Sequence, residues 1–329
     1  MTALSFERII SIDWSGADIE TEEVDLGVAL YDATEDALSI VGLEDLEDWS
    51  RKSCRRWLVE RLKEPRPTLV AVDFGFGLPW NSDLAIFSVS GWRKMVSRLG
   101  ALYQSYKTAR ATASAINGMP QFGGHGPYRI DYDRSDRHFY IDRQVGYYRL
   151  AELASPQAIS QWYMGYGPAV AFHTITGLYC LDLLLGLRDQ GVIDFEIWPH
   201  ETISPDSSKH VLAESYPALT VPLLCPHCNA PYPKSKGKQR KNSSGQQADK
   251  KKKAKKKYEP KQCMGCNQLG PWIDPHDEDA WRVLASLVNA QRAGELAHLF
   301  RITQHPFGRY DGIDFIDQVK FEGYILGLG

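Results

Sequence analysis

The chain begins with short apolar runs separated by polar turns. A short apolar run at 8–13 ends in an aspartate, with a turn-like Ser-Gly just beyond, and further runs occupy 24–32 and 37–42. Runs of this length bounded by turn residues predict β-strands. The stretch 67–80 contains another continuous apolar run, typical of a strand buried in a parallel sheet, and this run also ends in an aspartate and a glycine-rich turn. The segments 192–199 and 210–219 are strand-like as well.

Helical spacing of apolar residues appears between these strands. Residues 43–63 carry apolar side chains near helical spacing, with acids early and bases late, as a helix dipole favours. Helical signals recur near 91–112 and around 176–189. The last clear element, at 274–294, has an apolar stripe that follows an acidic first turn. The pattern therefore predicts a helix in each of these segments.

This order of elements predicts an α/β fold with a mixed five-stranded sheet flanked by helices, interrupted by a helical insertion and by a cysteine-bearing insert. The expected division is a first part of the core at 1–83, a largely helical insertion at 84–190, a second part of the core at 191–220, the cysteine-bearing insert at 221–270, and the last core helix with a C-terminal segment at 271–329.

The composition is that of an ordinary globular protein, with 43% hydrophobic and 24% charged residues in 329. The first residues lack the basic region and cleavage site of a secretory signal, so we expect a cytoplasmic protein. The longest apolar stretch, 177–187, is about half a bilayer span and carries Asp182. It predicts a buried helix and no membrane role.

The net charge of −3 conceals a strongly basic segment. Residues 234–261 hold thirteen Lys or Arg and two acids, so this segment carries +11 and the remainder of the chain −14. Such a lysine-rich loop on an acidic body suggests a nucleic-acid partner, whether DNA or RNA. The alternative is a solvated loop that only aids solubility.

Four of the six cysteines form two Cys-x-x-Cys pairs, Cys225 with Cys228 and Cys263 with Cys266. Four thiolates in two such pairs fill a tetrahedral structural zinc site, so residues 221–270 are predicted to form a zinc-ribbon-like module around the basic loop. Unrelated core cysteines or a redox pair are the alternatives. Cys54 and Cys180 lie alone in helical patterns and are interpreted as core residues.

Four carboxylates are the candidates for chemistry. Asp13 and Asp73 end the first and fourth predicted strands, and two parallel neighbours that end at one sheet edge would bring them together. Glu214 ends a later strand, and Asp279 lies in the first turn of the predicted last helix. Clustered anions coexist when a divalent cation lies between them or when one keeps its proton. The pattern indicates Mg²⁺ or Mn²⁺ and hydrolysis of a phosphodiester by two metal ions; taken singly, each acid is also explained as a turn former or helix cap.

Six short stretches then resemble successive motifs of domain-of-unknown-function family 429, whose members are predicted RNase H-like nucleases: IISIDWSGA, LVAVDFGFGLPW, EIWPHET, VLAESYPAL, EDAWRVLASL and FEGYILGLG. This resemblance implies an RNase H-like fold with Asp13, Asp73, Glu214 and Asp279 at the metal-binding positions. The element order also resembles RuvC-type resolvases, in which acids on the first and fourth strands and on the final helix bind the metals. Asp73 stands where those enzymes usually carry glutamate. Transposon-encoded RuvC-like nucleases are similar in carrying a zinc ribbon between the later acids.

The sequence thus leads to a metal-dependent nuclease as the first hypothesis. A non-catalytic, zinc-containing nucleic-acid-binding protein on the same fold is the second. An actin-like or sugar-kinase-type ATPase is the third, because that superfamily shares the strand order and an early Asp-x-Ser-Gly-like turn. The third hypothesis requires a second phosphate loop and a late Gly-Gly adenosine motif, and the sequence shows neither.

Overall fold

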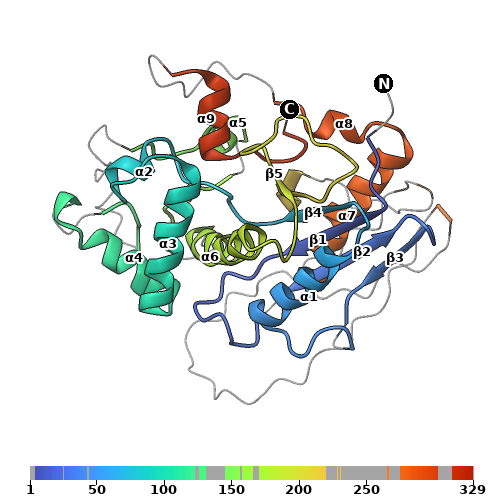
Figure 1. Cartoon of the computed structure of the whole chain (residues 1–329), viewed down its shortest axis with the longest axis horizontal. Helices are drawn as coiled ribbons and strands as arrows, with labels where there is room; N and C mark the ends of the chain where they lie inside the picture. Colours follow the sequence, from blue (N-terminus) through green and yellow to red (C-terminus); the bar gives the residue numbers. More distant parts are fainter. Residues whose placement is uncertain are drawn as a thin grey trace, which may run out of the picture.

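A mixed sheet of six strands organises the chain, in the order β3-β2-β1-β4-β6-β5 (Figure 1). β1 is antiparallel to β2 and β2 to β3, whereas β1, β4, β6 and β5 run parallel to one another. The carboxyl ends of these four parallel strands therefore lie along one edge. The strands are β1 (Arg8–Asp13), β2 (Gly27–Asp32), β3 (Ala37–Ile40), β4 (Thr68–Val72), β5 (Glu196–Trp198) and β6 (Val211–Glu214).

This computed structural model describes residues 4–24, 26–42, 44–122, 126–130, 145–155, 158–165, 170–219, 228, 230, 265–266, 275–302 and 313–328. The helices in these ranges are α1 (Arg51–Lys63), α2 (Ser82–Ala85), α3 (Trp92–Tyr106), α4 (Ala109–Asn117), α5 (Leu150–Ala154), α6 (Val170–Asp189), α7 (Pro275–Arg292), α8 (Leu296–Leu299) and α9 (Phe315–Glu322), with 3-10 turns η1 (Pro120–Phe122) and η3 (Pro217–Leu219). The described elements between β4 and β5 are helical.

Both faces of the sheet are buried, which makes the fold a three-layer arrangement. Alternate residues of each strand belong to different apolar clusters, as a strand's period of two requires: Ile10 and Val70 face the cluster built with α1, α3 and α6, while Ile9 and Leu69 face the cluster built with α7. Figure 1 shows α1 and α6 on one side of the sheet and α7 on the other. Continuous apolar runs in β1 and β4 follow from this double coverage.

The sequence predicts the mixed α/β fold correctly, but several details differ. The sheet has six strands in place of the expected five, because both 196–198 and 211–214 enter it. α1 begins after Ser50, whose side chain accepts a hydrogen bond from the Ser53 amide, so the acidic residues of the predicted helix at 43–63 precede the helix instead of filling its first turn. α7 is not the last helix, since α8 and α9 follow it.

Helix α6 is long and apolar enough, by length and composition alone, to cross a membrane, the one such helix in the part of the chain described. Its apolar side chains instead pack in the core: Ile175, Leu178 and Leu181 are fully buried beside the sheet and α3. The core position of α6 gives a sufficient reason for its apolar composition.

Candidate active site

Asp13 and Asp73 lie side by side at the carboxyl edge of the sheet. β1 and β4 pair in parallel with Ile12 opposite Val72, and the Asp73 amide donates to the Ile12 carbonyl at 3.0 Å. The two aspartates are the next residues on each strand. A hydrogen bond joins their side chains. The sequence-based expectation that these two acids meet agrees with this arrangement.

The pKa of Asp73 is raised well above its ordinary value. Burial is the main cause, followed by the negative charges of Asp13, Asp279 and Glu214 and by the hydrogen bond with Asp13. The charges of the other three predicted acids therefore reach Asp73 and disfavour its ionised form. A divalent ion bound between Asp13 and Asp73 would offset this repulsion.

Asp279 comes from the helix that covers this face of the sheet. α7 packs against β1 and β2, and its side chains Ala280, Val283 and Leu284 are buried there. The Asp279 side chain stays 44% exposed, with one oxygen 3.9 Å from Nε of Arg282. It can therefore reorient toward a ligand between the sheet edge and α7.

Glu214 leaves the sheet on the opposite face from Asp13. Side chains an even number of residues apart on a strand point to the same face of the sheet. Glu214 is two residues after Leu212, which belongs to the α6-side cluster, whereas Asp13 is four residues after Ile9, which belongs to the α7-side cluster. Both Glu214 oxygens are occupied by strong donors. Oε2 accepts from Nη1 of Arg149 at 2.7 Å and from the Phe76 amide at 3.0 Å, while Oε1 accepts from Nη2 of Arg149 at 2.6 Å. Glu214 is thus held as a buried ion pair beside the two aspartates.

Arg149 is fully buried and uses its whole guanidinium group. Nε and Nη2 donate to Glu152, Nη1 and Nη2 donate to Glu214, and Nη1 also donates to the carbonyl of Glu322. Gln161 donates to the same Glu152 oxygen at 3.0 Å. One cation therefore links the start of α5, the end of β6 and the end of α9.

The glycine-rich turn after β4 packs closely on this network. A Cβ on Gly77 would lie 2.4 Å from the Glu322 carbonyl, and one on Gly75 would lie 2.6 Å from the Gln161 side chain. The Glu322 carboxylate accepts from the Trp80 amide at 2.7 Å, which holds the far end of the turn. Close packing therefore explains these glycines without a phosphate loop.

A cavity of about 120 Å³ opens beside Asp73. Its walls come from the turn after β4, the start of α6, the segment 158–161 and the end of β6. The polar side chains in the wall are Asp73, Arg149, Glu152, Gln161, His173, Glu214, Ser215 and Tyr216. Burial and the charge of Asp73 raise the pKa of Tyr216, so its phenol stays protonated. The cavity joins the aspartate pair to the Arg149 network.

His200 lies two residues after the end of β5, and its ring is neutral. Nδ1 lies 2.6 Å from the Lys320 carbonyl and so carries the proton, while Nε2 is buried with no hydrogen-bond partner. The ring stacks on Trp92 with centroids 4.1 Å apart. Burial, and to a smaller extent the charge of Arg149, lowers the pKa of His200 to about 3.

A pH dependence of stability follows from His200. The unfolded chain binds a proton at this residue below about pH 6.5, whereas the folded protein does not until about pH 3, so stability is lost as the pH falls through this window. Between pH 7 and pH 5 the wild type should lose about 2 kcal/mol through this residue. His200→Asn can keep a donor to Lys320 and does not titrate. Urea unfolding at both pH values should show the extra loss in the wild type only; equal losses in both proteins would contradict it.

The predicted zinc ligands and the basic loop fall largely outside the described residues. Cys225, Cys263 and the whole of 234–261 are not among them, whereas Cys228 is exposed and Cys266 is partly buried against the α7-side cluster. Across the described ranges, no three or more His, Cys, Asp or Glu side chains are grouped so as to hold a metal ion. The zinc site and the joint metal site of the four acids remain predictions.

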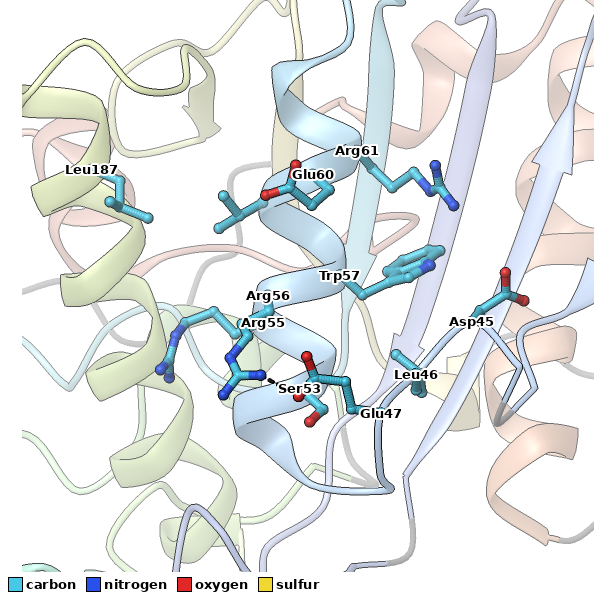
Figure 2. A pocket seen from close by; sticks show the side chains of 11 residues that line it. Asp45, Leu46, Glu47, Ser53, Arg55, Arg56, Trp57, Glu60, Arg61 and Leu187 are labelled. Atoms are coloured by element: carbon cyan, nitrogen blue, oxygen red, sulfur yellow. Dashed lines mark hydrogen bonds and ion pairs between the residues drawn. The ribbon is translucent and has the colours of Figure 1, made fainter.

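A larger groove, of about 510 Å³, lies along α1, and none of the four acids lines it (Figure 2). Its arginines already have partners. Arg56 pairs with Glu47 and Arg61 with Glu64, and Arg61 also lies over the Trp57 ring. Its charges are largely satisfied within the protein, so this groove offers little for an ionic ligand.

Comparison of the chain with protein-family models, with curated proteins and with solved structures gave no match. Sequence reasoning missed Arg149, Glu152, His200 and Glu322. His200 and Glu322 lie within the motif stretches EIWPHET and FEGYILGLG, so a signal for them was present. Arg149 lies in a stretch without periodicity, and two of its partners, Glu214 and Glu322, are 65 and 173 residues away.

Proposed function

We propose that the chain is a divalent-metal-dependent nuclease with an RNase H-like fold. The carrying observation is the meeting of Asp13 and Asp73 at the ends of the paired parallel strands β1 and β4, with Asp279 and Glu214 near enough for their charges to act on Asp73. The order of strands, with acids after the first and fourth and on the helix that covers them, fits the resemblance to RNase H-like nucleases. A zinc-ribbon-like insert held by Cys225, Cys228, Cys263 and Cys266 belongs to the same proposal.

The donor set suits a hard cation. Asp13 and Asp73 supply carboxylate oxygens from two strand ends, and the Asp279 side chain, which is 44% exposed, would supply a third. Oxygen ligands of this kind are those that Mg²⁺ and Mn²⁺ prefer. Glu214 is a weaker candidate for direct ligation because Arg149 and the Phe76 amide engage its oxygens.

In such a site a bound metal ion would polarise the phosphoryl group and lower the pKa of its water. The residues of the chain would do the rest. Asp13 and Asp73 fix the position of the charge, and the Arg149 guanidinium offsets part of the negative charge of Glu214 and Glu152 that would repel a phosphate. Tyr216 contributes a protonated phenol to the wall beside Asp73.

The test is incubation of the purified protein with labelled single- and double-stranded DNA and RNA. With Mg²⁺ or Mn²⁺ we expect cleavage of at least one substrate, and with chelator none. Protein carrying Asp13→Asn, purified identically, controls for a contaminating nuclease. If none of the four substrates is cut with either metal, the proposal is overturned. Retained binding would then favour the non-catalytic nucleic-acid-binding alternative.

A further inference from the structure

Helices α3 and α4 belong to a stretch of the chain that contains no acidic residue. Residues 84–130 hold six Lys or Arg and no Asp or Glu, in a protein with 41 acids among its 329 residues. The next acids are Asp83, which is buried, and Asp131. This segment lies outside the basic loop at 234–261. It is a second concentration of positive charge, and it belongs to the described core.

Four cations of this segment are exposed along α3 and at its junction with α4, where the Arg110 guanidinium lies over the Phe172 ring. Lys94 and Arg98 are one helical turn apart on the exposed side of α3, and Lys107 and Arg110 are exposed at the junction with α4. The opposite side of α3 packs against α6 through Met95 and other apolar residues. Between and beside the cations the exposed positions hold small side chains: Ser97, Ala101, Ser105 and Ser114. We call this the α3–α4 basic surface.

Among the residues that the structure describes, no carboxylate lies within 4.0 Å of any of these four cations. Arg93, on the flank of α3, instead pairs with Asp182 and Asp189 of α6. Four of the basic residues of α1 also form ion pairs: Arg55, Arg56, Arg61 and Lys63. Figure 2 shows the Arg56–Glu47 pair. Unpaired cations on α3 and α4 leave a positive field that an external anion can neutralise.

The α3–α4 basic surface is tied to the loop that follows Asp13. The carbonyl of Asp18 accepts from the Tyr103 hydroxyl at 3.1 Å and from the Ala109 amide at 3.3 Å, and the Asp18 carboxylate accepts from the Arg110 amide at 2.8 Å. Asp18 is five residues after Asp13, so their Cα atoms are at most about 18 Å apart. That length corresponds to about five nucleotide steps along one strand and applies to the end of the surface that contacts Asp18. Lys94 lies nine residues before Tyr103 on α3, about 14 Å or four further steps along the helix.

We propose that the α3–α4 basic surface binds the phosphate backbone of a nucleic acid whose cleaved bond lies at Asp13 and Asp73, contacting phosphates up to about nine steps from the cut. This inference rests on the proposed nuclease function and names its substrate-binding face. An acidic metal site repels a polyanion on its own, and four unpaired cations nearby offset that repulsion. Phosphate contacts fix position without reading sequence, so the surface favours no particular bases.

Two other anionic occupants fit the chemistry less well. An anionic membrane surface would be met by several apolar anchors beside the cations, and the exposed positions between these cations are small or polar except for Tyr106. An acidic protein would be recognised through an apolar centre ringed by charge, and among the exposed large hydrophobic side chains only Tyr106, 47% exposed, belongs to α3 or α4. Both remain as outcomes of the experiment.

The experiment compares Lys94→Gln/Arg98→Gln with Arg56→Gln/Lys63→Gln in the full chain carrying Asp13→Asn. The two pairs remove the same charge, but the second comes from exposed ion pairs of α1. Binding of a labelled 20-base-pair duplex is measured by fluorescence anisotropy across salt concentrations with chelator. We expect the α3 double variant to lower the slope of log K against log salt by about 1.8 and to weaken binding roughly tenfold near 0.1 M salt. The α1 variant should match its parent.

An unchanged slope in the α3 variant, or an equal change in the α1 variant, would overturn the proposal. So would a loss of binding to anionic lipid vesicles, or to an acidic polypeptide such as polyglutamate, without a loss of binding to the duplex. Shortening the duplex stepwise should make the two variants converge once the contacted side no longer reaches Lys94 and Arg98, at fewer than about nine nucleotides. Because binding is scored without cleavage, wild-type protein that binds in this way but never cuts would refute the nuclease and leave this surface standing. If the wild type cuts nucleic acid but the α3 double variant leaves the slope of log K against log salt unchanged, the nuclease proposal stands and the proposed binding surface is refuted.

Discussion

Asp13→Asn will lower metal-dependent cleavage about a thousand-fold and leave the folded protein at least as stable as the wild type. The loss follows because metal stabilisation of transition-state charge contributes several kcal/mol, and about 4 kcal/mol corresponds to three decades in rate. The stability follows because Asp13 is one of the charges that raise the pKa of Asp73. Removing it relieves a repulsion, so the variant should fold normally.

Thermal unfolding with and without Mn²⁺ separates these effects from activity. A cation that binds only the folded state stabilises it by about 2.7 kcal/mol at one hundred times its dissociation constant. The wild type should therefore melt at a higher temperature in Mn²⁺ than in chelator, whereas Asp13→Asn should melt at nearly the same temperature in both. A variant that gains as much stability from Mn²⁺ as the wild type would show that Asp13 is not a metal ligand.

Glu214→Gln is the informative comparison for the fourth acid. If Glu214 ligated the metal as Asp13 does, the two variants would lose Mn²⁺ stabilisation equally. Because Arg149 and Phe76 occupy the Glu214 oxygens, we expect Glu214→Gln to keep most of the Mn²⁺ response while lowering stability in chelator. Equal loss of the Mn²⁺ response would restore Glu214 to the ligand set.

The sequence predicts that Asp13 and Asp73 meet, because the signal for each residue is local. Each ends an apolar run, and parallel pairing of β1 with β4 suffices to bring them together. The face on which Glu214 leaves the sheet depends instead on its register with β4, where it lies opposite Val72. A shift of one residue would reverse that face, and no local pattern near Glu214 fixes it. The strand was therefore foreseeable, and the direction of its last side chain was not.

The Arg149 network escapes sequence analysis for a related reason. Its contacts join α5, β6 and α9, which lie far apart in the chain, and each partner taken alone looks like an ordinary charged residue of a helix or turn. Periodicity identifies elements that bury an apolar face, but it carries no information about which buried charges meet. The start of α1 differs from the prediction for another reason. The helical pattern runs from residue 43, but the Ser50 side chain caps the helix, which begins only at Arg51.

Arg149→Met will destabilise the protein by about 3–5 kcal/mol, the usual cost of removing one partner from a buried ion pair. Glu152 and Glu214 are both buried, and the variant leaves them without their shared cation. Methionine fills similar volume without a donor, so the loss measures charge and hydrogen bonding more than a cavity. Urea unfolding at pH 7 gives the number, with Arg56→Met as a matched control whose exposed ion pair should cost less than about 1 kcal/mol.

The pH dependence of the same variant tells charge apart from packing. Burial raises the pKa of Glu214 even in the wild type, and Arg149 opposes that rise. Without Arg149 the pKa of Glu214 climbs further, so the folded variant binds a proton that the unfolded chain releases, and its stability must fall as the pH rises from 5 to 8. The gap between wild type and variant should therefore narrow toward acid pH. A gap that stays constant across this range would mean that Arg149 acts by filling space, and the electrostatic account of this network would fail.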